Sequence, residues 1–474
     1  MINRQFSPIL RLPPEIMADI FSACITVPSG AASYAHRWTP KPEAIMPLVL
    51  GMVCRTWREL AWSIPQLWRT IPISLNDPDH PSPNFEVFES WIARSGRCPL
   101  FIDVSYDEDI GCPDSEDYID DNGDPYEISL FRLLARTSER WYSANFDLHS
   151  CAYSILQCVS GRLPLLTSLY INIAESDCLP EPGTTFYDRP WDMFNSAPQL
   201  RSVKVDGYEP DMFSFNWDQL NEVSLNPVQA DDCLEILSKC PGLSRCTFGK
   251  IPPVDSEEFP SGPQEPILAS ELVFLSLQVD EDRLQSGSDT FAYILDGLTT
   301  PVLRELQIKA STMITLPPSF NLHSLLSRST CSLQRLVLHG LLCYTKALFN
   351  CLDGISSIVE LEMRECFANN DTVIRLLDQS DFSSASRTFL PNLRSLTLIE
   401  LRGDCIDFRN MVKVFSARRS GAVGTSSVKL QSATIQLRPE PFDVPTDVVE
   451  HLRQLCAEGM QISIRAKDTI IFQG

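Results

Sequence analysis

The sequence has no uninterrupted run of about 18 apolar residues, the shortest length that spans the hydrocarbon core of a bilayer. Its beginning also lacks the apolar stretch of a secretory signal peptide, because Pro8, Arg11, Pro13 and Pro14 interrupt it. We therefore expect an intracellular protein, cytoplasmic or nuclear, without a membrane partner.

Basic residues are scarce. The chain has 39 Lys and Arg against 61 Asp and Glu, which gives a formal net charge of -22. A protein that binds phosphate backbones needs clustered cations. The charge balance therefore argues against a nucleic-acid partner, and such acidity more often keeps a large protein dispersed.

Motifs for metals, disulfides and catalysis are also missing. The 16 cysteines are scattered, with no C-x-x-C pair and no zinc spacing, which indicates reduced thiols used as small apolar side chains. No G-x-S-x-G, H-E-x-x-H or Gly-rich phosphate loop occurs. The acidic run 107–124 resembles a calcium loop only loosely, because Tyr118 stands where an EF-hand needs an acid. We expect a protein that is not an enzyme and has no cofactor or metal. The six histidines lie far apart in the sequence: His36, His80, His149, His323, His339 and His451.

The first segment that is rich in signals runs from residue 12 to residue 73. Pro13 and Pro14 suit a helix start, and Glu15 favours the first turn of a helix. Apolar residues then recur at helical spacing to residue 25, and Pro28 stops the helix. A second helix is predicted from Pro47, and P-Q-L-W at 65–68 predicts a short third turn. Periodicity alone leaves open whether these apolar residues form a core or an outward surface.

The order of these residues resembles a known family. L-P-P-E-I-x-x-x-I-F at 12–21 is similar to the opening of the F-box, and V-C-R-T-W-R-E-L-A at 53–61 with P-Q-L-W is similar to its second half. The combination resembles the F-box proteins that are numerous in mushroom-forming fungi. The connection between the halves, residues 27–45, is longer than in a minimal F-box.

The resemblance implies a role in ubiquitination rather than a reaction. F-box modules bind the Skp-family linker, and through it a cullin, while the rest of the chain presents a substrate. A few aromatic and aliphatic side chains can dominate such an interface. Each tryptophan can equally pack the core of the module itself. Carried over by motif, the linker-binding residues are Leu12, Pro13, Ile16, Ile20, Val53, Cys54, Trp57, Leu67 and Trp68.

Residues 76–150 carry weaker signals and are interpreted as a linker with an acidic loop and the first irregular strands. Residues 76–83 are rich in Pro and Asp, as linkers are. Helices are predicted at 85–93 and 129–136, and strands at 99–105 and 141–148.

From about residue 151 to the end, a leucine pattern of the form L-x-x-L-x-L recurs every 25 to 35 residues or so, with helical or polar stretches between the copies. The pattern predicts short parallel strands that bury alternate side chains, stacked as an irregular solenoid similar to leucine-rich repeats. Another α/β fold with leucine-rich parallel strands stays open. The copies begin at Leu165, Gln199, Gln219, Val302, Ser332, Ser357 and Asn392.

The fold class is thus predicted as α/β: a small helical F-box at 1–75, then a leucine-rich-repeat-like region at 151–474 with a parallel sheet. The expected function is the substrate-recognition subunit of an SCF-type ubiquitin ligase with an unknown protein target. The alternative is a leucine-rich-repeat scaffold that is not coupled to ubiquitination. The strand residues expected to face the target are Arg201, Lys204, Glu222, Glu305, Gln307, Arg335, Glu360, Glu362 and Arg394.

Overall fold

The computed structural model is an α/β protein whose large sheet is mostly parallel, as the sequence predicts. The chain divides into two compact units, Met1–Leu220 and Asn221–Gly474. The described residues are 8–24, 45–75, 85–106, 126–148, 156–173, 191–210, 212–253, 265–280, 288–315, 322–342, 345–352, 355–366, 389–401, 407–420, 428–438, 444–466 and 469–474.

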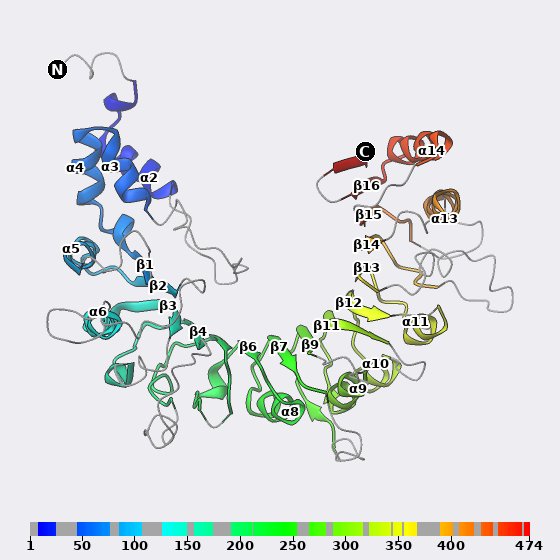
Figure 1. The fold of residues 1–474 in the computed structure, drawn as a ribbon, viewed down its shortest axis with the longest axis horizontal. Coiled ribbons are helices and arrows are strands. Elements are labelled where there is room, and N and C mark those ends of the chain that lie inside the picture. Colours follow the sequence, from blue (N-terminus) through cyan, green and yellow to red (C-terminus); the bar gives the residue numbers. More distant parts are fainter. Residues whose placement is uncertain are drawn as a thin grey trace. The chain divides into compact units, whose positions relative to one another are not determined.

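Unit 1 begins with a helical module and continues into five parallel strands (Figure 1). The strands pair in chain order from β1 to β5. The helical module comprises η1 (Pro8–Arg11), α2 (Pro14–Ala23), α3 (Met46–Val53), α4 (Arg55–Ser63) and η2 (Pro65–Trp68). The sheet comprises β1 (Thr70–Leu75), β2 (Leu100–Tyr106), β3 (Trp141–Leu148), β4 (Ser168–Ile173) and β5 (Ser202–Asp206). The helices and turns of its crossovers are α5 (Phe85–Arg94), α6 (Tyr126–Ala135), η4 (Ser138–Arg140), η6 (Gln157–Val159) and η7 (Trp217–Gln219).

The helical module is held together by an aromatic core that also joins it to the sheet. Phe21 of α2 and Trp57 of α4 meet edge to face, with ring centroids 5.0 Å apart. Trp68 is buried, donates its indole N–H to the carbonyl of Ala61 at 2.9 Å, and meets Trp91 of α5 edge to face at 4.8 Å. Trp91 in turn donates to the carbonyl of Thr70 in β1 at 3.0 Å. The module and the first strands therefore share one core.

These contacts divide the chain differently from the predicted boundaries after residues 75 and 150. β1, inside the predicted F-box range, pairs in register with β2, inside the predicted linker. β3 continues the same sheet to β4. The predicted helices and strands of 85–148 are present as α5, β2, α6 and β3. The Pro- and Asp-rich stretch 76–83, the acidic run 107–124 and most of the connection 27–45 lie outside the described residues.

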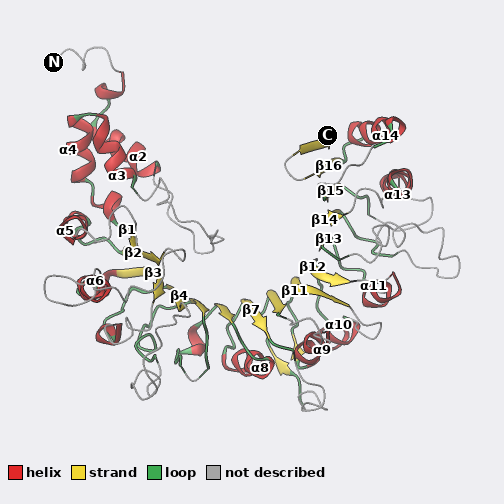
Figure 2. Ribbon diagram, in the orientation of Figure 1, coloured by secondary structure: helices red, strands yellow, loops and turns green. Residues whose placement is uncertain are grey.

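Unit 2 is a sheet with helices on one side (Figure 2). Its strands are parallel in the order β6-β7-β9-β11-β12-β13-β14-β15-β16, and β17 closes the edge antiparallel to β16. A separate two-stranded pair joins β8 to β10. The strands are β6 (Glu222–Asn226), β7 (Arg245–Ile251), β8 (Ile267–Leu268), β9 (Phe274–Val279), β10 (Leu298–Thr299), β11 (Glu305–Thr315), β12 (Arg335–Leu342), β13 (Glu360–Arg364), β14 (Ser395–Leu401), β15 (Ser432–Leu437), β16 (Gln461–Ala466) and β17 (Thr469–Gln473).

The helices of unit 2 lie along the same side of its sheet, and among the described residues none covers the other side (Figure 2). We call that uncovered side the open face. The sequence predicts helical or polar stretches between the leucine copies, and the described residues of unit 2 contain six helices. The helices are α8 (Ala230–Lys239), α9 (Ser288–Asp296), α10 (His323–Ser329), α11 (Thr345–Leu352), α13 (Phe408–Ser420) and α14 (Thr446–Ala457).

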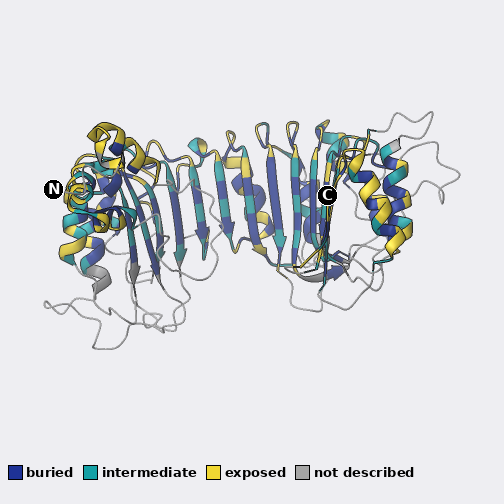
Figure 3. Ribbon diagram, turned by 90° about the horizontal axis from the view of Figure 1, so that it is seen from above, coloured by how far each residue is buried: buried dark blue, intermediate teal, exposed yellow. Residues whose placement is uncertain are grey.

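The leucine pattern forms an in-register ladder beneath the helices. Leucines at the same position of five neighbouring strands pair with one another, and all are buried. Because side chains alternate along a strand, the residues next to each ladder leucine point to the open face. Burial along most strands alternates between buried and intermediate or exposed (Figure 3), but Ser276 and Val337 on this face are buried. The ladder consists of Leu275, Leu306, Leu336, Leu361 and Leu396.

Candidate functional site

Two surfaces stand out: one on the helical module of unit 1 and one on the open face of unit 2. On α2, four apolar residues divide into two pairs at helical spacing. Met17 and Phe21 are buried, whereas Ile16 and Ile20 are exposed. A core needs one apolar stripe, so the second pair, 46% and 37% exposed, adds apolar surface that the module covers only in part.

A second set of exposed apolar side chains lies on α3. Leu50 faces inward, but Leu48 and Val49 are exposed, Val53 is 59% exposed and Met52 is 79% exposed. The helix sequence M-P-L-V-L-G-M-V contains no charged residue on any side. A short helix of this composition on a module surface necessarily leaves apolar groups in contact with water.

The predicted linker-binding residues fall into an outer and an inner set. Leu12, Pro13, Ile16, Ile20 and Val53 are exposed, as binding requires. The other four are Cys54, Trp57, Leu67 and Trp68, which are half-buried or buried.

The inner set holds the module together. Cys54 caps α4 through its sulfur, which accepts from the backbone N–H of Trp57 at 3.5 Å. Leu67 and Trp68 belong to the core and can support the outer surface only from beneath.

Sequence reasoning did not assign Leu48, Val49 and Met52 to this surface. The signal that could have found them is the absence of a polar face on α3. A predicted helix that is apolar all round needs cover on every side, and a module of a few short helices cannot supply it.

The open face of unit 2 carries polar side chains in rows, because the strands pair in register. Two rows matter most. The basic row, near the carboxyl ends of the strands, consists of Lys309 on β11, His339 on β12 and Arg364 on β13, which stand opposite one another. The Arg335 cluster, four residues earlier in each strand, consists of Glu305, Arg335 and Glu360 with the adjacent Glu362.

Arg335 is surrounded by three carboxylates. Its Nε lies 3.4 Å from Glu305, and its two terminal nitrogens lie 3.3 Å from Glu360 and 3.1 Å from Glu362. One cation against three acids leaves the cluster with a formal charge of -2. These side chains are partly exposed, so each pair contributes at most about 1 kcal/mol of stability.

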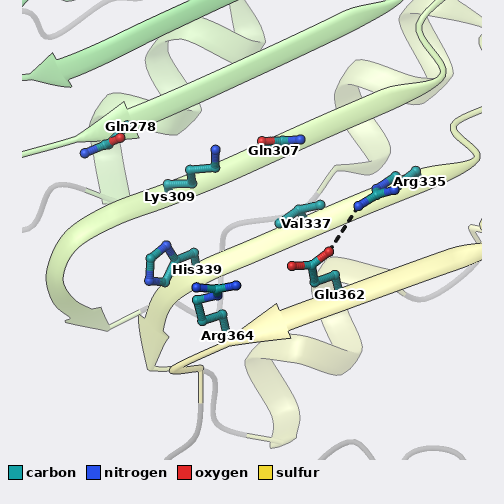
Figure 4. Close-up of a pocket in the computed structure, with 8 residues that line it drawn as sticks. All are labelled: Gln278, Gln307, Lys309, Arg335, Val337, His339, Glu362 and Arg364. Atoms are coloured by element: carbon teal, nitrogen blue, oxygen red, sulfur yellow. Dashed lines mark hydrogen bonds and ion pairs between the residues drawn. The ribbon is translucent and has the colours of Figure 1, made fainter. Parts of the chain in front are cut away.

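The two rows flank a hollow of about 380 Å³ whose middle is the short side chain of Val337 (Figure 4). Gln278 and Gln307 add amide groups to its wall. His339 lies 3.3 Å from Glu365. Among the described residues, Lys309 and Arg364 have no carboxylate within ion-pair distance.

Lys309 is a partly buried cation of the hollow. Burial lowers the pKa of its amine, and neighbouring Arg364 lowers it too, whereas Glu362 and Glu305 act in the opposite direction. A lysine held in this way gains more than an exposed one from an anion placed beside it.

The other residues predicted to face the target have separate surroundings. Lys204 lies 3.2 Å from Asp206 and over the ring of Tyr170 in unit 1. Glu222 lies 3.8 Å from Arg245. Arg201 and Arg394 are exposed just before their strands. Of the predicted set, only Gln307, Arg335 and Glu362 line the hollow, and Glu305 and Glu360 contact it through Arg335.

Searches for other kinds of site add little. Among the described residues, no three His, Cys, Asp or Glu side chains are arranged to hold a metal ion. In the same part of the chain, every helix is too short or too polar to cross a bilayer. Compared with protein-family models and with curated proteins, the sequence matches none.

Proposed function

We propose that this chain is the substrate-recognition subunit of a cullin-RING ubiquitin ligase. In this proposal the helical module binds the Skp-family linker, and the strand array of unit 2, a solenoid of leucine-rich-repeat type, binds a protein substrate. The observation that carries the proposal is the second apolar pair on α2. Ile16 and Ile20, with Leu12 before them, stay exposed at the positions that the F-box resemblance assigns to the linker.

Physical chemistry supports a protein partner for this surface. Exposed aliphatic groups gathered on one small module lose contact with water when a partner covers them. A few such anchors carry most of the binding energy of an interface. The open face of unit 2 supports the second half of the proposal, because a polar sheet face that no described helix covers is available to another protein.

Co-purification of the intact chain with a Skp-family protein tests the proposal. The double change Leu12→Ser and Ile16→Ser removes two exposed apolar groups and no core residue, so the chain should fold and lose the linker. We expect at least a hundredfold weaker binding, since truncation of one anchor costs about 2 kcal/mol. A matched control is Leu268→Ser, which removes a leucine that is 62% exposed in unit 2. Loss of binding in the control, or its retention in the double variant, contradicts the proposal.

The inner set of motif residues favours one alternative, a binding scaffold without a role in ubiquitination. Cys54, Trp57, Leu67 and Trp68 are required for the fold of the module itself. Similarity at these positions would therefore persist in a chain that no longer binds the linker. Two results would favour this alternative. Partner proteins would be recovered without any ligase subunit, and their degradation rate would not change when residues 12–73 are deleted.

A further inference from the structure

The strongest unassigned feature of the molecule is the separation of charge across the hollow of unit 2. Its basic row contributes Lys309 and Arg364, which have no carboxylate partners among the described residues. The Arg335 cluster on the other side has a surplus of carboxylates. Two cations without an ion-pair partner among the described residues, in a chain whose formal net charge is -22, point to a ligand that supplies an anion.

We propose that the hollow is a recognition site for an acidic peptide segment of a partner protein, with carboxylate side chains bound by Lys309 and Arg364. The proposal rests on the proposed function only in that the open face of unit 2 is the face that meets the substrate. It names the chemistry of that substrate, and it does not depend on the linker.

The geometry fits a peptide with closely spaced acids. Lys309 and Arg364 stand two strands apart in one row, with His339 between them. Neighbouring strands are about 4.8 Å apart, so the two backbones are separated by roughly 10 Å. Acidic residues two apart in an extended peptide point to the same side and are about 7 Å apart, a difference that the long side chains of Lys309 and Arg364 can span. Both cations can thus be engaged at once.

The floor and the walls define where the acids sit. Val337 is short and buried at the centre, which leaves room between the rows. The carboxylates of Glu305 and Glu360 repel an anion at the other side of the hollow, and the carboxylate of Glu362, which stands opposite Val337, lies 3.1 Å from Arg335. An acidic segment is therefore confined to the side formed by the carboxyl ends of the strands, where Gln278 adds an amide to the wall.

The large negative charge of the whole chain does not cancel this local attraction. At physiological ionic strength the Debye length is about 8 Å, so exposed charges farther away are largely screened. The partly buried amine of Lys309 is screened less. Charge-assisted hydrogen bonds from both cations should then decide the affinity.

Fluorescence anisotropy with the full-length chain tests the site directly. The probe is a labelled peptide in which glutamates at every second position alternate with serine and glycine, and its counterpart has glutamine at every glutamate. We expect the glutamate peptide to bind at physiological salt at least about tenfold more tightly than the glutamine peptide, the effect of one charged hydrogen bond. Equal binding of the two peptides overturns the proposal.

Variants locate the binding. Lys309→Gln and Arg364→Gln should each weaken the glutamate peptide about tenfold, whereas Arg364→Lys should retain most of the affinity. Arg465→Gln is the matched control, because Arg465 lies in the same row on β16, three strands beyond Arg364, and its loss changes the net charge equally. Circular dichroism melts establish that each variant is folded. A loss of affinity in Arg465→Gln equal to that in Arg364→Gln shows general charge attraction and overturns the site.

The two proposals fail separately. A chain that binds the glutamate peptide and not the Skp-family protein loses the role in ubiquitination and keeps this site. A chain that binds the Skp-family protein and not the glutamate peptide keeps the role and loses this site.

Discussion

At the scale of single residues, the close approach of β11 and β12 depends on one glycine. Gly340 follows the basic row directly and has φ of +70°. A Cβ added there would lie 2.4 Å from the carbonyl oxygen of Ala310 on the neighbouring strand. Real Cβ atoms do not come so near to a backbone atom, so any other residue must displace a strand that carries Lys309.

Gly340→Ala should therefore destabilise the protein more than backbone strain alone explains. Gly161 is the matched control: its φ is +73°, and no described residue lies within 4 Å of an added Cβ. Gly161→Ala should cost about 1 kcal/mol from the left-handed backbone conformation, and Gly340→Ala clearly more. Urea denaturation followed by circular dichroism measures both. Equal losses for the two variants would contradict the proposed steric role of Ala310.

Tyr293 on α9 is a second residue whose surroundings make a measurable prediction. Burial and a hydrogen bond from its hydroxyl to Asp231 on α8 raise the pKa of the phenol to about 12. Because the folded pKa is raised, the stabilisation that this group contributes is fully present below about pH 10 and is lost as pH rises through about 12.

The phenolate absorbance of the wild-type chain minus that of Tyr293→Phe should titrate with a midpoint near 12. In an Asp231→Ala background the midpoint should fall only part of the way toward the ordinary value, since burial is the larger cause. Circular dichroism at each pH shows that the chain is still folded. A midpoint near 10 in the folded protein would show that the phenol is not held as the structure places it.

At the scale of elements, the junction between the helical module and the sheet depends on α5. Trp91→Ala removes both the edge-to-face contact with Trp68 and the hydrogen bond to Thr70. We expect a loss of about 3–5 kcal/mol in the stability of unit 1, the usual cost of deleting a buried tryptophan. Trp62→Ala is the control, because Trp62 is 44% exposed in the same module and should cost about 1 kcal/mol at most. Thermal melts monitored by circular dichroism compare the stabilities of the two variants. Similar losses of stability would show that the junction does not depend on Trp91.

Strands whose buried side chains recur as leucines in the sequence were predictable. The seven leucine-patterned segments are strands, since their alternate side chains are needed beneath the helices. β7 was missed although it follows a buried leucine, Leu243, and β9 was missed although Leu272, Leu275 and Leu277 match the pattern L-x-x-L-x-L. β7 reads R-C-T-F-G-K-I, where a cysteine and a phenylalanine take the places of leucine, and a rule built on leucine does not detect them.

The candidate sites were less predictable, because they depend on which residues of different strands stand opposite one another. Lys309, His339 and Arg364 lie 25 residues or more apart in the chain, so the sequence alone does not group them. The one regularity is that each follows a predicted surface position by four residues. Register between strands is set by the turns and the core, and it brings the three together. On α2, periodicity revealed the apolar residues, and only packing against Trp57 distinguishes Phe21, which faces inward, from Ile20, which faces outward.

At the scale of the whole molecule, the reactivity of the cysteines shows which parts of each unit are closed to solvent. Cys24 and Cys158 in unit 1 are exposed, whereas Cys233, Cys246 and Cys351 in unit 2 are buried. Burial raises the pKa of all three buried thiols, to about 12 for Cys351. The thiolate is the reactive form, so the buried cysteines are protected twice, by exclusion of the reagent and by protonation.

Alkylation with iodoacetamide near neutral pH, followed by peptide mass spectrometry, should modify Cys24 and Cys158 in the native protein and leave Cys233, Cys246 and Cys351 intact. With increasing urea, the buried thiols should become reactive together, at the concentration at which the circular dichroism signal of the strands is lost, since one core encloses them. Because these thiols lie under the sheet that carries the basic row, their joint protection is a test of the scaffold itself. If Cys233 or Cys351 reacts in the native chain as fast as Cys24, the core of unit 2 is not closed as described, and the register that brings Lys309 and Arg364 to one hollow loses its support.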